Sequence, residues 1–136
     1  ENLDVNVVNL MALMATIEEF QDPNEVKVVV NRNNEALYFS REPIPSLKTG
    51  AQVVQMLKQV CIIPFKRDYL LEFNELDETD LERIESVDMM RIIENGGVVK
   101  MVMTNEAIFS VDTEYDRAVV EAKMVGDQLM PFYVDK

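Results

Sequence analysis

Residues 22–45 read DPNEVKVVVNRNNEALYFSREPIP and hold the strongest structural signals of the chain. The β-branched run at 26–31 predicts a strand, and the RNN stretch at 32–34 predicts a turn, because asparagine tolerates the left-handed backbone conformation. The ALYFS stretch at 36–40 predicts the partner strand of a hairpin. Prolines follow in EPIP and lack the N–H that strand pairing needs, so an extended loop is expected there.

Strands and helices alternate in the prediction for the rest of the chain. The apolar run at 5–15 has the length and valine content of a buried strand, although periodicity alone leaves a helix open. Thr16 followed by Glu19 then predicts a capped helical turn. Further strands are predicted at 59–65 and 98–103, and further helices at 67–74, from 79 or 80 up to the glycine pair 96–97, and at 114–125. This alternation predicts an α/β sheet rather than a sandwich or a bundle.

The two middle helices are each predicted to bury one face. In helix 67–74 the inward positions are Tyr69, Leu70 and Phe73. The next helix is interpreted as one continuous element, because apolar residues recur at helical spacing as far as the glycine pair. Those apolar positions are Leu81, Ile84, Val87, Met90 and Ile93.

The composition is that of a soluble globular domain. The chain has 136 residues, of which 48% are hydrophobic and 28% are charged, so we expect one domain or part of one. The formal net charge of −12 would repel a phosphate backbone, and no nucleic-acid partner is expected. A small anionic substrate would need a local basic patch or a divalent cation to screen the repulsion.

The cysteine and histidine counts exclude several kinds of site. Cys61 is the single cysteine, which rules out an intrachain disulfide and predicts a reducing, cytoplasmic setting. The chain has no histidine, so the commonest general base is missing. No apolar run approaches the roughly 18 residues that span a membrane, so no membrane partner is expected.

Four segments, in this order and at these spacings, resemble the CMP-Kdo synthetases, which join CMP to Kdo (3-deoxy-manno-octulosonate). They are DPNEVKVVV at 22–30, ALYFSREPIP at 36–45, LERIES at 81–86 continuing to Arg91, and VDT at 111–113 ahead of a helix. The first two segments together are highly specific, whereas VDT alone would be weak. The resemblance covers about residues 20–125, which is most of the chain.

The resemblance implies a mixed-sheet α/β fold of the nucleotide-diphospho-sugar transferase type. It also implies a cytoplasmic homodimer, with the hairpin near the dimer contact. The family's N-terminal half carries a basic, glycine-containing loop for the CTP phosphates, and nothing in this sequence matches that loop. Residues 1–136 are therefore expected to form a single partial domain, the sugar-acid-binding and dimerising half, without the N-terminal nucleotide-binding half.

The implied activity is a CTP- and Mg²⁺-dependent nucleotidyl transfer in the synthesis of lipopolysaccharide or surface-polysaccharide precursors. The anomeric hydroxyl of Kdo or a related keto-sugar acid would attack the α-phosphorus of CTP, and pyrophosphate would leave. Such transfers depend on positioning and charge neutralisation, and the 136 residues alone are expected to be inactive. Two alternatives stay open: a non-catalytic dimerisation or binding domain derived from the family, and a sialic-acid-type cytidylyltransferase.

The resemblance nominates five site residues. Asp112 would bind Mg²⁺, Arg41 would face the sugar-acid carboxylate, and Glu85 and Asp88 would line the sugar pocket. Gln59 is a further substrate-binding candidate and stands where the family commonly has a histidine. Without the resemblance, Asp112 could simply start a helix, Arg41 could pair with a surface acid, and the two acids of the sugar pocket could belong to a solvated helix face.

Overall fold

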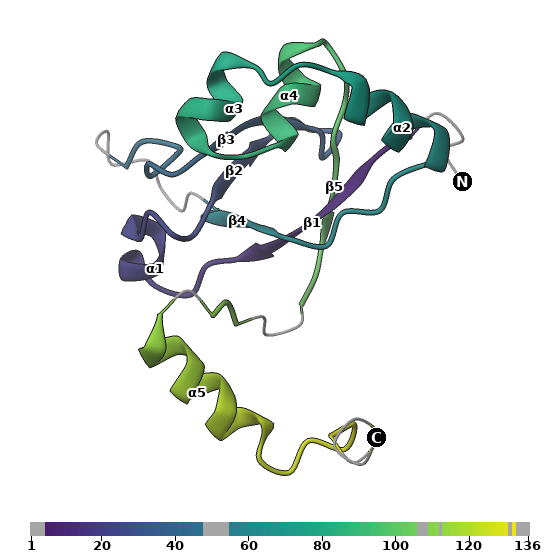
Figure 1. Ribbon diagram of the computed structural model, residues 1–136. Coiled ribbons are helices and arrows are strands. Elements are labelled where there is room, and N and C mark those ends of the chain that lie inside the picture. The colour runs from purple at the N-terminus through teal and green to yellow at the C-terminus, as the bar shows by residue number, and fades with distance from the viewer. Residues whose placement is uncertain (1–4, 48–54, 106–108, 112, 131, 133–136) are drawn as a thin grey trace. The chain divides into compact units, whose positions relative to one another are not determined.

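The computed structural model describes residues 5–47, 55–105, 109–111, 113–130 and 132, which fall into two compact units, 1–106 and 107–136. Among these described residues, the first unit holds a five-stranded sheet with helices packed on it, and the second unit holds one helix (Figure 1). The predicted α/β class with a mixed sheet is confirmed.

The sheet has the strand order β3-β2-β4-β1-β5. Neighbouring strands are antiparallel except β1 and β5, which run parallel. The predicted strands at 5–15 and 98–103 are confirmed, and the helix alternative for 5–15 is wrong. The strands are β1 (Val8–Leu13), β2 (Lys27–Val30), β3 (Ala36–Ser40), β4 (Leu57–Val60) and β5 (Lys100–Met103).

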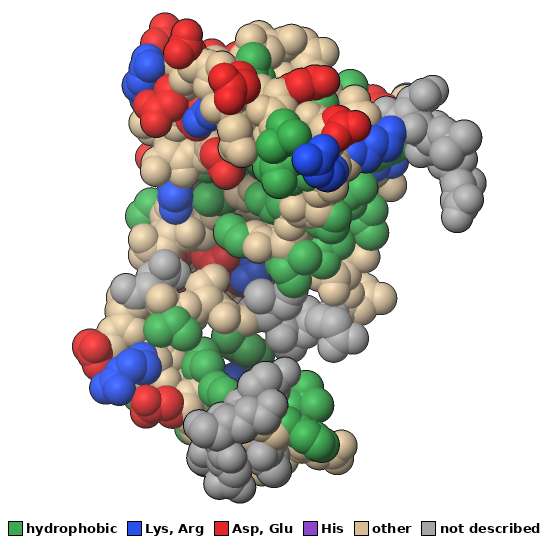
Figure 2. Space-filling view, turned by 45° about the vertical axis from the view of Figure 1, so that its right-hand side comes forward, with side chains coloured by type: hydrophobic (Ala, Val, Ile, Leu, Met, Phe, Trp, Pro, Cys, Tyr) green, Lys and Arg blue, Asp and Glu red, His purple; other side chains and the backbone are tan. Residues whose placement is uncertain are grey.

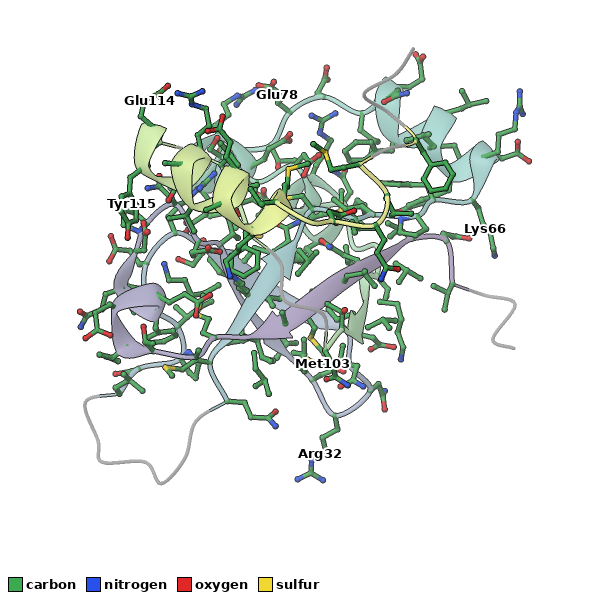
Figure 3. All side chains as sticks on the ribbon, turned by 90° about the horizontal axis from the view of Figure 1, so that it is seen from below. Arg32, Lys66, Glu78, Met103, Glu114 and Tyr115 are labelled. Atoms are coloured by element: carbon green, nitrogen blue, oxygen red, sulfur yellow. The ribbon has the colours of Figure 1, made fainter. Side chains whose placement is uncertain are left out.

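The hairpin of β2 and β3 forms as predicted. Asn34 adopts the left-handed conformation with φ 55°, and Arg32 at the turn points away from the sheet (Figure 3). The turn also reaches β5, because the Ala36 N–H donates to the Val99 carbonyl at 2.9 Å. The Met101 N–H donates to the Asn34 carbonyl at 2.7 Å. These bonds pair part of the edge of β5 that faces away from β1.

The segment after β4 departs from the prediction of a strand at 59–65. β4 ends at Val60, because the Ile62 N–H turns back and donates to the Val60 carbonyl at 2.7 Å. Beyond this bend the chain still follows β1, since the carbonyls of Ile62 and Pro64 accept hydrogen bonds from Leu10 and Val8. The prediction located the segment correctly, but the regular strand is shorter and begins earlier.

Helices α1 (Ile17–Gln21) and α2 (Arg67–Glu75) form where they were predicted. Thr16 caps α1, because its side chain accepts a hydrogen bond from the Glu19 N–H at 3.2 Å. In α2 the inward prediction holds for Phe73, which is buried, but it is wrong for Leu70, which is 39% exposed.

The predicted single helix after residue 79 is wrong, because the structure has two helices, α3 (Asp80–Glu85) and α4 (Met89–Glu94). Ser86 lies between them in the left-handed conformation with φ 53°, which ends the first helix. The break leaves Ile84 74% exposed. It also turns the second helix so that it presents its apolar side to the sheet.

The hydrophobic core of unit 1 lies between the sheet and the layer of α2, α3 and α4, as Figure 1 shows. Burial of this apolar surface is the main stabilising term for the unit. The core combines residues of the sheet with residues of the helices and the segments beside them. Its fully buried members include Val7, Val28, Phe39, Met89, Met90, Ile92, Val99 and Met101.

Helix α5 (Glu114–Met124) belongs to the second unit and confirms the helix predicted at 114–125. Thr113 and Asp116 form a capping box at its start, with the Asp116 N–H donating to Thr113 Oγ1 at 3.2 Å. None of the helices among the described residues is long and apolar enough to cross a membrane.

Candidate functional site

Arg41 and Glu85, two of the nominated residues, lie against each other where β3 meets α3. The backbone N–H of Arg41 donates to Glu85 Oε2 at 2.8 Å, and the Arg41 Nε donates to the Glu85 carbonyl at 3.0 Å. Each side chain therefore binds the backbone of the other residue. The structure places these two residues in contact, and it leaves their substrate roles untested.

The Glu85 carboxylate is fully engaged by the hairpin. Its Oε1 accepts hydrogen bonds from the Tyr38 hydroxyl at 3.0 Å and from Ser40 Oγ at 3.3 Å. Burial and the neighbouring Glu85 carboxylate raise the pKa of Tyr38, so its hydroxyl remains a donor at neutral pH. Glu85 thus holds β3 against the helix layer.

The Arg41 guanidinium makes four hydrogen bonds, all to backbone carbonyls. Besides the bond to Glu85, it donates to Ser86 at 3.2 Å and to both Pro23 and Asn24 at 3.2 Å. A guanidinium has five N–H donors, so most of its donors are used by the protein. This side chain ties the end of β3 to two loops that are distant in sequence.

Lys27 is a third charged residue that binds backbone groups, and the sequence analysis did not single it out. It is 0% exposed, and its Nζ donates to the carbonyls of Asp22 at 2.5 Å, Glu25 at 2.8 Å and Arg41 at 2.7 Å. Burial lowers the pKa of Lys27, although nearby carboxylates oppose this. The available signal was a lysine inside the apolar strand VKVVV.

Asp88, which precedes α4, is exposed and differs from these three residues. No hydrogen bond to its carboxylate is recorded among the described residues, and it makes no side-chain cap bond to α4. It borders a shallow cavity of about 320 Å³ that Glu82, Arg83 and Ser86 also line. Figure 2 shows acidic and basic side chains intermingled over the helix layer of this unit.

Glu82 and Arg91 form a largely buried ion pair beside that cavity. Arg91 Nη2 lies 2.6 Å from Glu82 Oε1, and Arg91 Nε lies 2.8 Å from Glu82 Oε2. This two-point contact to Arg91 lowers the pKa of Glu82 despite its burial. Arg91 also donates to the Leu76 carbonyl at 3.1 Å, so the pair joins α3 and α4 to the end of α2.

Gln59 lies in β4 and is half-buried. Its amide nitrogen donates to Oδ1 of Asn9 in the neighbouring strand at 2.6 Å. Asn9 is 0% exposed and was missed by the sequence analysis, although a polar residue within the apolar run VNVVNLMALMA was a visible signal. The structure does not test whether Gln59 contacts a substrate.

Asp112, the nominated metal ligand, lies outside the described residues. The helix cap that follows it is described, because Thr113 begins α5. Among the described residues, no group of three or more histidine, cysteine or acidic side chains is arranged to hold a metal ion. Mg²⁺ often takes only one or two protein carboxylates, with phosphates and water completing its shell, so Asp112 stays a prediction.

The five-stranded mixed sheet with its layer of helices is a fold of the nucleotide-diphospho-sugar transferase class. A family model described as "Cytidylyltransferase" matches residues 1–121. The chain belongs to this family, and within it to the CMP-Kdo synthetases.

Several curated relatives are named 3-deoxy-manno-octulosonate cytidylyltransferase. The one from Fusobacterium nucleatum is 36% identical over 84% of this chain and 46% of its own length. The one from Geobacter metallireducens is 35% identical over 92% of this chain and 53% of its own length. The one from Leptospira interrogans is 41% identical over 73% of this chain and 39% of its own length. The chain thus spans about half the length of the curated relatives it matches.

A solved structure has the same fold. It is a CMP:2-keto-3-deoxy-manno-octonic acid synthetase complexed with CTP, and it matches this chain with a TM-score of 0.82 and 31% sequence identity. The match covers 93% of this chain and 52% of the synthetase chain. The similarity therefore extends over nearly all of these residues but over only half of the solved protein.

Proposed function

We propose that the protein containing this chain joins CMP from CTP to Kdo or a related keto-sugar acid, and that this chain supplies the sugar-acid-binding and dimerising half. The observation that carries the proposal is the TM-score of 0.82 to a synthetase that holds CTP. Because the match covers 52% of that synthetase, the CTP phosphates would be bound mainly by residues outside these 136.

In this proposal the nominated residues divide into two kinds. Gln59 and Asp88 would contact the sugar, because each has a polar atom without a hydrogen bond to the described residues. Arg41 and Glu85 would hold the hairpin in place, because their polar groups are bound by other parts of the protein. A sugar carboxylate at Arg41 would compete with four backbone carbonyls rather than meet a free guanidinium fork.

The proposal assigns Mg²⁺ binding to Asp112, which in the sequence directly precedes Thr113, the N-cap of α5. When bound, such an ion would neutralise negative charge on the phosphates. That neutralisation matters in a chain with a net charge of −12, since both substrates are anionic. The same acidity gives no support to a nucleic-acid partner.

A second candidate is a non-catalytic dimerisation or binding domain derived from the same family. The observation that favours it is the engagement of Arg41 and Glu85 by protein groups, which would be enough to explain why both are present. It predicts a protein that keeps the fold and self-associates without transferring CMP.

The test is pyrophosphate release by the full-length gene product with CTP, Mg²⁺ and either Kdo or a sialic acid. We expect release with Kdo or a related keto-sugar acid, and none from the 136-residue chain alone. A full-length protein that forms dimers but releases no pyrophosphate with any acceptor would favour the second candidate. Pyrophosphate release by the 136-residue chain alone would contradict the proposal that residues outside these 136 are needed to bind the CTP phosphates.

A further inference from the structure

Asn9 is a fully buried polar residue on the core-facing side of the sheet. It lies two positions before Met11 in β1, so both side chains face the same way, and Met11 belongs to the hydrophobic core. Met11 is also the cross-strand partner of Gln59. A buried amide among apolar residues is costly unless its hydrogen bonds are made, so the arrangement of its partners is informative.

The orientation of Asn9 is fixed by backbone groups. Its Nδ2 lies 2.6 Å from the Val60 carbonyl and 3.0 Å from the Leu10 carbonyl, and a carbonyl oxygen can only accept a hydrogen bond. The amide nitrogen must therefore point at these carbonyls, which leaves Oδ1 on the other side. The bend after β4 contributes here, because regular pairing ends at Val60.

The orientation of Asn9 in turn fixes Gln59. Oδ1 of Asn9 accepts at 2.6 Å, so the donor from Gln59 is its Nε2, and Oε1 of Gln59 faces away. No hydrogen bond to this oxygen is recorded among the described residues. Gln59 is half-buried, and within that part of the chain its Oε1 is not among the buried side-chain polar atoms without a partner, where Thr79 Oγ1 is found.

We propose that Asn9 is a positioning residue that makes Gln59 present a hydrogen-bond acceptor, and that this oxygen selects a substrate hydroxyl. The inference rests on the proposed function, since it concerns the sugar-acid site. The relay runs from the Val60 carbonyl through the amide of Asn9 to the amide of Gln59, so the acceptor is set by the backbone rather than by the ligand. A group without a hydrogen to donate would leave the acceptor unsatisfied.

The first experiment removes the acceptor in the full-length protein. Gln59→Met keeps the length of the side chain but has no oxygen. It should raise KM for Kdo by about fivefold to tenfold, the factor that one hydrogen bond contributes, and should leave KM for CTP within about twofold. One compound in a series of monodeoxy Kdo analogues should bind wild type worse than Kdo, and Gln59→Met should lose that preference.

The second experiment separates positioning from a purely structural role. Asn9→Leu should raise KM for Kdo by a similar factor, and the double variant with Gln59→Met should show no further loss, because both act through one oxygen. Asn9→Thr should retain affinity within about twofold, since a hydroxyl can donate to Val60 and accept from Gln59. Additive losses, or equal losses for CTP and Kdo, would show that Asn9 only supports the fold.

A readout without turnover keeps this inference separate from the proposed function. The side-chain amide signals of Gln59 in an NMR spectrum should shift in Asn9→Thr, and in wild type they should shift when Kdo is titrated. An inactive full-length protein would refute the proposed function alone, if these signals still respond. Signals that respond to neither change would overturn the inference, as would an active enzyme in which Gln59→Met leaves KM for Kdo unchanged.

Discussion

The charged residues at the hairpin differ from Gln59 and Asp88 in what their polar atoms bind. Lys27, Arg41 and Glu85, here called the hairpin clasp, use their charged groups to bind backbone or hydroxyl groups of the protein. Gln59 and Asp88, here called the open pair, each keep an oxygen without a hydrogen bond to the described residues. Of the residues that the resemblance nominated, Arg41 and Glu85 therefore use their polar groups to hold the fold, whereas Gln59 and Asp88 each have an oxygen that could accept a hydrogen bond from a ligand.

The largest loss of stability should come from removing the buried ammonium group of Lys27 from the hairpin clasp. Lys27→Met keeps the aliphatic stem but leaves three carbonyls without their donor, and unmade buried hydrogen bonds cost roughly 1–3 kcal/mol each. The variant no longer buries a charge, and this offsets part of the cost. We therefore expect a net loss of about 3 kcal/mol in the free energy of unfolding. Urea denaturation followed by circular dichroism would measure it.

The matched control is Lys66→Met, because Lys66 is an exposed lysine at the start of α2. That substitution should change the free energy of unfolding by less than about 0.5 kcal/mol. If the two variants lose the same stability, the buried position of Lys27 has no special role, and the clasp must be redefined without it.

The next largest loss of stability is expected at Arg41. Here a role in the hairpin clasp and a role in binding the sugar carboxylate predict different outcomes. Arg41→Lys replaces a planar five-donor fork by one ammonium, which cannot reach four carbonyls at once. We expect a loss of about 1–2 kcal/mol in stability and weaker protection of hairpin amides in hydrogen exchange. Arg67→Lys, at an exposed arginine paired with Asp68, is the control and should be nearly neutral.

An effect of Arg41→Lys on substrate binding without an effect on stability would contradict the placement of Arg41 in the hairpin clasp. If Arg41→Lys leaves stability unchanged while KM for Kdo rises at least tenfold, then Arg41 binds the sugar carboxylate directly. It would then belong with the open pair.

A smaller effect is expected from the ion pair of Glu82 and Arg91. The contact with Arg91 lowers the folded-state pKa of Glu82 below its ordinary value, so the unfolded state takes up a proton first as pH falls. Glu82 therefore contributes stability that is present above pH ~4.5 and is lost as pH falls through the folded pKa. Unfolding midpoints between pH 7 and pH 3 should fall less steeply in Glu82→Gln than in wild type. Equal slopes would mean that other carboxylates dominate the acid response.

Much of the fold could be predicted because its signals are local. The β-branched run of β2, the asparagine turn and the capping threonine of α1 each act within a few residues, and all formed as expected. The break at Ser86 and the bend after Val60 had no such local signal. Both belong to contacts between segments distant in sequence, since the Ser86 carbonyl accepts from Arg41 and the Val60 carbonyl accepts from Asn9.

The sequence could nominate candidate site residues, but it could not indicate which of their polar atoms are already bound by other parts of the protein. The resemblance brought Arg41 and Glu85 to notice, and the structure places them in contact. Their hydrogen bonds to backbone and hydroxyl groups depend on segments that meet only in the folded chain, and no spacing in the sequence reveals them. Asn9 and Lys27 carried a signal of another kind, a polar residue within an apolar strand, and such residues must find buried partners.

The smallest effect on stability should come from Asp88 in the open pair. Asp88→Ala removes a carboxylate that makes no cap bond to α4, so the loss should be limited to its favourable charge near a helix start and near Arg91, about 0.5 kcal/mol. If Asp88 accepts hydrogen bonds from the sugar, KM for Kdo in the full-length protein should rise about fivefold. Asp68→Ala, at an exposed acid in the first turn of α2, should match it in stability and leave KM for Kdo unchanged. If Asp88→Ala lowers the free energy of unfolding by more than about 2 kcal/mol, Asp88 supports the fold and belongs with the hairpin clasp. An exposed carboxylate without hydrogen bonds is not expected to stabilise the fold so strongly.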